Sequence, residues 1–121
     1  MGKLVVANYK MNGDKNFYQT VQNKFNNLKL QDTKIILCPP FVYLSNFSLS
    51  NKNIELGAQN ISSKTDNKST GEISPIMLRD FNVKYCLIGH VERRNMGEDL
   101  NLIKEKISNA ICMASEVAFS F

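Results

Sequence analysis

The sequence has no tryptophan, a single histidine, three cysteines and three prolines in 121 residues. Its cysteines, Cys38, Cys86 and Cys112, are odd in number and lack the Cys-x-x-Cys or Cys/His spacing of a zinc site. We therefore expect buried thiols in a reducing compartment, with no metal site. No apolar run approaches the roughly 20 residues of a membrane-spanning helix, which argues against an integral membrane protein. The sequence also shows no secretory signal, so we expect a cytoplasmic protein.

Basic runs and glycine-rich phosphate loops are also absent. The net charge of +4 arises from 15 basic and 11 acidic residues, and the lysines are scattered without interleaved aromatic residues. This pattern argues against nucleic-acid binding but is compatible with small anionic partners. Because neither the dinucleotide nor the nucleoside-triphosphate loop motif occurs, we expect no nucleotide cofactor.

Five short apolar runs divide the chain, at residues 4–7, 35–38, 54–58, 85–88 and 117–121. They are continuous rather than alternating, which is typical of strands buried on both faces of a parallel sheet. Strand length and spacing therefore predict alternating β and α units within one domain over residues 1–121. Such units form either a doubly wound sheet or a barrel, and in both the working residues follow the carboxyl ends of the strands.

Helical patterns lie between the apolar runs. Apolar residues recur at helical spacing at Phe17, Val21, Phe25 and Leu28. A short helix is expected within residues 41–50, and Ser74 with Pro75 predicts a capped helix start before residues 76–81. The clearest amphipathic stripe comprises Leu100, Ile103, Ile107, Ile111 and Ala114, and it follows the acidic residues Glu98 and Asp99 at the helix start.

Polar side chains follow the first and third predicted strands. Lys10 comes just after the first run, where it is either an ordinary solvated lysine or a fixed cation for an anion. Gln59 and Asn60 follow the third run and are typical of hydrogen bonding within a loop.

The fourth run leads directly into His90, the only histidine, followed by Glu92, Arg93 and Arg94. A histidine at a strand end is either a hydrogen-bonded structural residue or a functional one. If a short helix starts here, its N-terminus would keep the imidazole neutral. Glu92 is either an acid or base, or the partner of a neighbouring cation such as Lys10.

Five strand-end stretches, in this order and spacing, resemble triosephosphate isomerases. They are Ala7-Asn8-Tyr9-Lys10-Met11-Asn12-Gly13, Cys38-Pro39-Pro40, Leu56-Gly57-Ala58-Gln59-Asn60, Ser69-Thr70-Gly71-Glu72-Ile73-Ser74 and Ile88-Gly89-His90-Val91-Glu92-Arg93-Arg94. The resemblance covers essentially the whole chain and implies a partial (β/α)8 barrel, an α/β fold of about five parallel strands and four helices. It ends at the fifth of the family's eight strands.

The resemblance also implies a function and a set of site residues. The family interconverts dihydroxyacetone phosphate and D-glyceraldehyde 3-phosphate in glycolysis and gluconeogenesis without a cofactor. Asn8 and Lys10 match its substrate-contacting pair, His90 its electrophile and Glu92 the acidic neighbour of the lysine. The neutral histidine and the glutamate base are established chemistry of this family and are not inferred from this sequence.

The resemblance further implies a homodimer or a complementing chain. The segment 66–74 matches a loop that inserts into a partner subunit, with Thr70, Gly71 and Glu72 at the interface. In this segment Asn67-Lys68-Ser69 replaces an apolar stretch that is usual in the family, which places the packing of the loop in question.

Two further departures concern the site. Val91 stands where the family usually has a serine that contacts the catalytic carboxylate. The base glutamate and the phosphate-binding glycines follow later strands of the family, and Glu116, at the start of the final predicted strand, cannot replace that base. We therefore expect this chain to be inactive alone. Two alternatives are a non-catalytic binding or assembly module and a diverged barrel enzyme for another small phosphorylated sugar.

Overall fold

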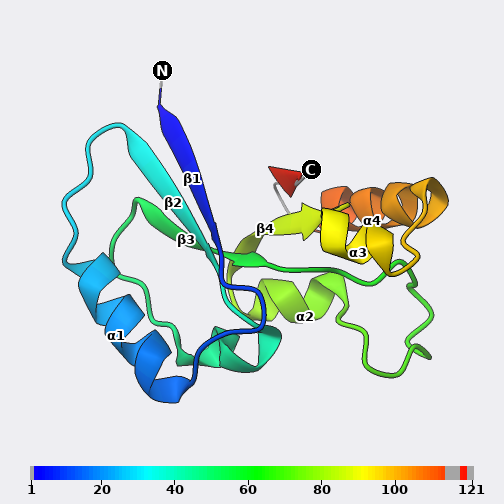
Figure 1. Cartoon of the computed structure of the whole chain (residues 1–121), viewed down its shortest axis with the longest axis horizontal. Helices are drawn as coiled ribbons and strands as arrows, with labels where there is room; N and C mark the ends of the chain where they lie inside the picture. Colours follow the sequence, from blue (N-terminus) through cyan, green and yellow to red (C-terminus); the bar gives the residue numbers. More distant parts are fainter. Residues whose placement is uncertain (1, 114–117, 120–121) are drawn as a thin grey trace. The chain divides into compact units, whose positions relative to one another are not determined.

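The computed structural model describes residues 2–113 and 118–119 (Figure 1). The chain forms two compact units, residues 1–57 and 58–121. Its elements, in order, are β1 (Lys3–Asn8), α1 (Lys15–Asn26), β2 (Thr33–Cys38), the 3-10 helix η1 (Phe41–Asn46), β3 (Ile54–Ala58), α2 (Pro75–Asp80), β4 (Val83–Ile88), α3 (Val91–Asn95), α4 (Leu100–Met113) and β5 (Ala118–Phe119). This alternation confirms the predicted α/β class of a partial barrel. That residues 1–121 form a single domain stays a prediction.

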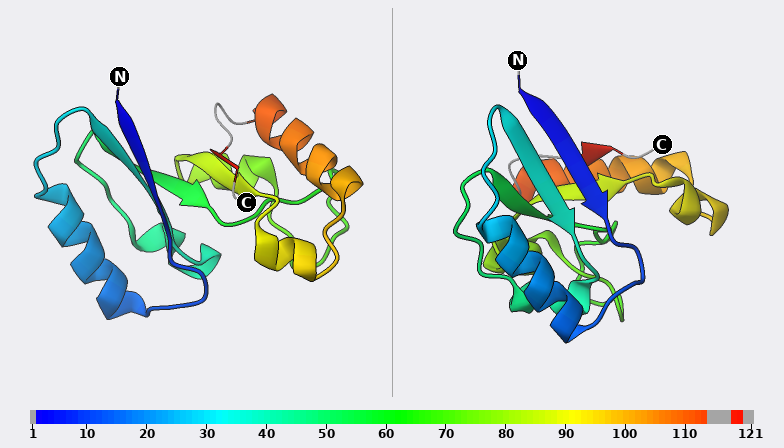
Figure 2. Two further views of the ribbon diagram at one scale, coloured as in Figure 1. Left: turned by 45° about the horizontal axis from the view of Figure 1, so that its top comes forward. Right: turned by 60° about the vertical axis from the view of Figure 1, so that its left-hand side comes forward.

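The first unit is built on parallel strands. β1 pairs with β2 in a register that runs from Lys3 opposite Thr33 to Asn8 opposite Cys38. β2 pairs in turn with β3. Figure 2 shows α1 running alongside the β1–β2 pair. Asp14 caps α1, because its Oδ1 accepts the Phe17 N–H at 2.8 Å.

The second unit places helices against β4. α2 and α4 contact each other and both contact β4. β4 also pairs in parallel with β5, with Ile88 opposite Phe119. The predicted start of α2 is confirmed: Ser74 Oγ accepts the Met77 N–H at 3.2 Å, and Pro75 occupies the first helical turn.

The strand predictions are confirmed except for one burial pattern. β2, β3 and β4 are mostly buried, whereas Leu4 and Val5 of β1 are 53% and 48% exposed. The expectation that β1 is buried on both faces is therefore wrong, because too little of the described chain packs against the faces of β1 to cover Leu4 and Val5. The fifth run is described only at residues 118–119, and Glu116 lies outside the described residues.

The helix predictions hold with small shifts. α1 ends at Asn26, so Leu28 follows it, and the irregular third connection forms a 3-10 helix. α4 contains the predicted stripe residues only partly on its buried side: Ile103 is buried, whereas Leu100 and Ile111 are 69% and 64% exposed, and Ala114 lies outside the described residues.

The burial of the cysteines is confirmed where the structure describes it. Cys38 and Cys86 are buried thiols, while the side chain of Cys112 lies outside the described part. Desolvation raises the pKa of the Cys38 thiol to about 12. Within residues 2–113 and 118–119, every helix is too short or too polar to cross a membrane.

Candidate functional site

The segment after β1 is a tight turn that presents Lys10. Asn8 Oδ1 accepts the Lys10 N–H at 2.9 Å. Both the backbone N–H and the side-chain amide of Asn12 donate to the Tyr9 carbonyl, at 3.2 and 3.0 Å. Lys10 has φ +54°, a left-handed conformation that a residue with a Cβ adopts only at a cost of about 1 kcal/mol. The turn therefore fixes the backbone from which the Lys10 ammonium extends.

An aromatic cluster supports this turn. The Tyr9 ring lies edge-on to Phe17 and Tyr18, with centroid distances of 5.9 and 5.5 Å. Tyr18 is fully buried, and its hydroxyl donates a hydrogen bond to the Asn12 carbonyl. Burial raises the pKa of both Tyr9 and Tyr18, so both hydroxyls remain protonated donors at neutral pH.

His90 follows β4 and caps α3, the short helix that the sequence suggested. Its Nδ1 accepts the Glu92 N–H at 3.1 Å. A ring nitrogen that accepts an N–H carries no proton itself, so in this geometry Nε2 is the ring nitrogen that can act as an N–H donor. The side chain is 15% exposed, which leaves a mostly enclosed N–H donor.

The Glu92 carboxylate lies beside the same ring. Its Oε2 is 3.6 Å from His90 Nδ1, and its side chain is 54% exposed. This distance exceeds that of a hydrogen bond, whereas the backbone contact to Nδ1 is within range. The Glu92 backbone N–H, rather than its carboxylate, is therefore the hydrogen-bond partner of His90 Nδ1.

Arg94 reinforces the start of α3. Its Nε donates to the Gly89 carbonyl at 2.7 Å. Gly89 has φ +74°, a conformation that favours glycine, and a Cβ there would lie 3.0 Å from Arg94 Nη2, so the end of that side chain would have to shift slightly. The residue that precedes His90 is thus held in place from α3.

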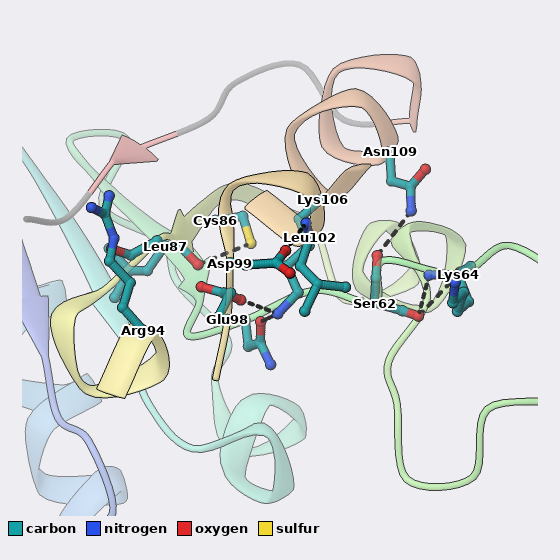
Figure 3. A network of polar contacts seen from close by, with 12 residues as sticks. Ser62, Lys64, Cys86, Leu87, Arg94, Glu98, Asp99, Leu102, Lys106 and Asn109 are labelled. Atoms are coloured by element: carbon teal, nitrogen blue, oxygen red, sulfur yellow. Dashed lines mark hydrogen bonds and ion pairs between the residues drawn. The ribbon is translucent and has the colours of Figure 1, made fainter. Parts of the chain in front are cut away.

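A buried ion pair that the sequence did not indicate lies deeper in the second unit (Figure 3). Lys106 of α4 pairs with Glu98, and both side chains are 4% exposed. Lys106 Nζ also donates to Asn60 Oδ1 at 2.9 Å. Glu98 was expected as an acidic residue of the first helical turn, but it precedes α4, and Asp99 Oδ1 caps the helix by accepting the Leu102 N–H at 2.9 Å. The sequence feature that could have indicated an inward-facing Lys106 is its position three residues after Ile103, on the buried face of α4.

The same region holds the base of the segment 66–74. Asn109 Nδ2 donates to the Ser62 carbonyl at 2.9 Å (Figure 3), and the Ser62 N–H donates to the Ile73 carbonyl at 2.9 Å. Thr70, Gly71 and Glu72 are exposed. A cavity of about 240 Å³ lies within it. The segment is therefore closed at its base, with its proposed interface residues accessible.

The structure thus brings the predicted site residues together in two pairs. Asn8 and Lys10 share one turn in the first unit, and His90 and Glu92 share another in the second. Both turns directly follow strands, as the sequence predicted.

The sequence of the chain is similar to those of known proteins. The family model of triosephosphate isomerase matches residues 3–117. The chain is 40% identical over 112 residues to a triosephosphate isomerase of Idiomarina loihiensis, covering 85% of this chain and 43% of the relative. It is 39% identical over 120 residues to one of Buchnera aphidicola, covering 93% and 46%. A third relative, from Wigglesworthia glossinidia brevipalpis, is 44% identical over 95 residues, covering 75% and 37%.

The chain therefore spans somewhat less than half the length of these curated relatives. The family match nevertheless extends over nearly all of its own residues, including both site turns. The chain belongs to the triosephosphate isomerase family and corresponds to the N-terminal part of that family's proteins.

Proposed function

We propose that this chain contributes Asn8, Lys10, His90 and Glu92 to a site that interconverts dihydroxyacetone phosphate and D-glyceraldehyde 3-phosphate. The observation that carries the proposal is the Glu92 N–H bond to His90 Nδ1 at 3.1 Å. In this geometry Nε2 is the ring nitrogen that can donate a hydrogen bond to a substrate carbonyl. No cofactor is needed for a reaction that moves only protons within one substrate.

The other three residues have roles that follow from charge and position. Lys10 supplies a cation that complements the substrate phosphate and the negative charge of an enediolate intermediate. Asn8 holds the Lys10 backbone through its side-chain oxygen and contacts the substrate beside it. His90 moves protons between the two substrate oxygens, and Glu92 acts as the acidic neighbour of the lysine.

The 121 residues supply an electrophile and a cation, but no glutamate matches the family's base. We therefore propose that the chain alone does not turn over. Thr70, Gly71 and Glu72 would form part of a homodimer interface, and their exposure supports this role. A cytoplasmic location would suit a substrate made and consumed in glycolysis and gluconeogenesis.

The test is complementation. The chain would be co-expressed with the C-terminal part of the Idiomarina loihiensis relative that lies beyond the matched region, and isomerase activity measured in a coupled assay. The proposal predicts activity from the pair that neither part shows alone. His90→Gln should lower that rate by at least about 100-fold, because the carbonyl loses its proton-transferring partner. A complemented rate that His90→Gln and Lys10→Met leave unchanged would contradict the proposed roles.

A second candidate is a non-catalytic assembly module. It is favoured by the exposure of Leu4 and Val5 on β1, an apolar strand with an unpaired edge among the described residues. Such strands associate readily with other chains. Light scattering of the purified chain tests this second candidate: a stable monodisperse monomer counts against the assembly module.

A further inference from the structure

We propose that Tyr18 is a positioning residue for Lys10: its hydroxyl and its ring together hold the turn that keeps the Lys10 backbone left-handed. The functional meaning of this rests on the proposed role of Lys10 as a substrate-binding cation. The geometry itself rests only on contacts within the first unit.

The turn around Lys10 requires support from outside itself. Lys10 has φ +54°, a conformation that side chains with a Cβ disfavour. The bonds from Lys10 to Asn8 and from Asn12 to Tyr9 close the turn, but they connect residues 8–12 only to one another. The entry to the turn is tied to the sheet, since the Tyr9 N–H donates to the Cys38 carbonyl at 3.1 Å.

Tyr18 provides the matching anchor at the exit of the turn. Its hydroxyl donates to the carbonyl of Asn12, two residues beyond Lys10. Its ring lies edge-on to Tyr9, at 5.5 Å and 84°, one residue before Lys10. One side chain therefore contacts the turn on both sides of Lys10.

Gly13 shows how closely the chain approaches this ring. A Cβ at Gly13 would lie 2.6 Å from Tyr18 Cε2, a separation that no real side chain tolerates, and φ there is +95°. Any larger residue would displace the ring or the turn. The turn and the ring therefore fit each other at Tyr9, Asn12 and Gly13.

Tyr18 is itself held rigidly. It is fully buried on α1, and its ring contacts Phe17 at 5.0 Å, Tyr43 at 5.1 Å and Phe47 at 5.9 Å. These neighbours come from α1, from η1 and from the residue that follows η1. Because the Tyr18 ring and the turn that it holds are fixed before any ligand binds, the Lys10 backbone needs little reorganisation to bind an anion.

The experiment uses Tyr18→Phe, which keeps the ring and removes the hydroxyl. The matched control is Tyr43→Phe, which removes a hydroxyl from the same cluster at a ring that contacts Tyr18. Amide exchange rates and the Lys10 Cα and Cβ chemical shifts would be measured by NMR on the isotope-labelled chain. These shifts report the left-handed backbone directly.

We expect Tyr18→Phe to speed exchange of the Lys10 and Asn12 amides about fivefold, as for the loss of one hydrogen bond. The Lys10 shifts should move toward averaged values, while amides within α1 and β2 keep their rates. Gly13→Ala should produce the same local pattern, and Tyr43→Phe should not. Lys10 and Asn12 rates within twofold of the parent would overturn the proposal. So would a uniform increase at all amides, because Tyr18 would then act only as a core residue.

A separate titration with inorganic phosphate distinguishes this inference from the proposed function. The Lys10 resonances of the unsubstituted chain and of Tyr18→Phe are followed as phosphate is added, and the amides on either side of residue 10 are followed in Lys10→Met as the control. A Tyr18-dependent turn with no phosphate response at Lys10 supports the positioning role and counts against the proposed function. A phosphate response that Tyr18→Phe leaves unchanged, together with unchanged exchange, overturns the positioning role alone.

Discussion

Replacing Lys106 by methionine should destabilise the fold more than any other lysine substitution on α4. Lys106 and Glu98 are each 4% exposed, and Lys106 Nζ also bonds Asn60 Oδ1 at 2.9 Å. Methionine keeps most of the aliphatic length of lysine and removes the charge. The variant therefore leaves the Glu98 carboxylate buried without its cation.

The magnitude follows from that uncompensated charge. Breaking a buried ion pair by removing one partner costs about 3–5 kcal/mol. The Glu98 carboxylate is already incompletely hydrogen-bonded, since its Oε2 has no hydrogen-bond partner among the described residues.

The assay is urea unfolding followed by far-UV circular dichroism. Lys104→Met is the matched control, because Lys104 is exposed on the same helix and should change the free energy of unfolding by less than about 0.5 kcal/mol. The double variant Glu98→Gln/Lys106→Met removes both charges and should recover most of the lost stability. A Lys106→Met variant within about 1 kcal/mol of Lys104→Met would refute the reasoning.

Three further predictions concern other parts of the chain. Because burial raises the pKa of Cys38 from 9.0 to about 12, folding favours the protonated thiol and stability falls as pH rises above 9. Between pH 8 and 10 the parent should lose about 1.4 kcal/mol more than Cys38→Ala in urea unfolding, and equal losses would contradict this. Asp14→Ala removes the cap of α1 and should cost about 1 kcal/mol, whereas the exposed Asp80→Ala should not. Gly13→Ala should lower the melting temperature more than Gly71→Ala: both glycines have positive φ, but only at Gly13 would a Cβ meet other atoms.

The positions of the elements could be predicted because their signals are local. Continuous apolar runs mark the strands, and Ser74-Pro75 marks the start of α2. The burial of β1 could not be predicted in this way, because an apolar run does not say how many neighbours its strand has. Leu4 is therefore exposed although its sequence is typical of a buried strand.

The candidate site could be predicted in part. The strand-end positions of Lys10 and His90 follow from the sequence, as does a short helix after His90, whereas the capping of that helix by His90 was not predicted. The contact of Tyr18 with the Lys10 turn depends on how α1 packs against that turn, and the spacing of apolar residues in the sequence does not predict this packing. Lys106 was missed because a lysine within an amphipathic helix is normally solvated, and only its buried partner Glu98 makes the inward position tolerable.

We propose that these 121 residues hold the electrophile and the cation of an isomerase site without its base. The most direct measurement is the rate at which the purified chain alone converts dihydroxyacetone phosphate, followed by a coupled reductant assay. We predict no rate above that of buffer. Turnover typical of the family by this chain, abolished in His90→Gln, would contradict the claim.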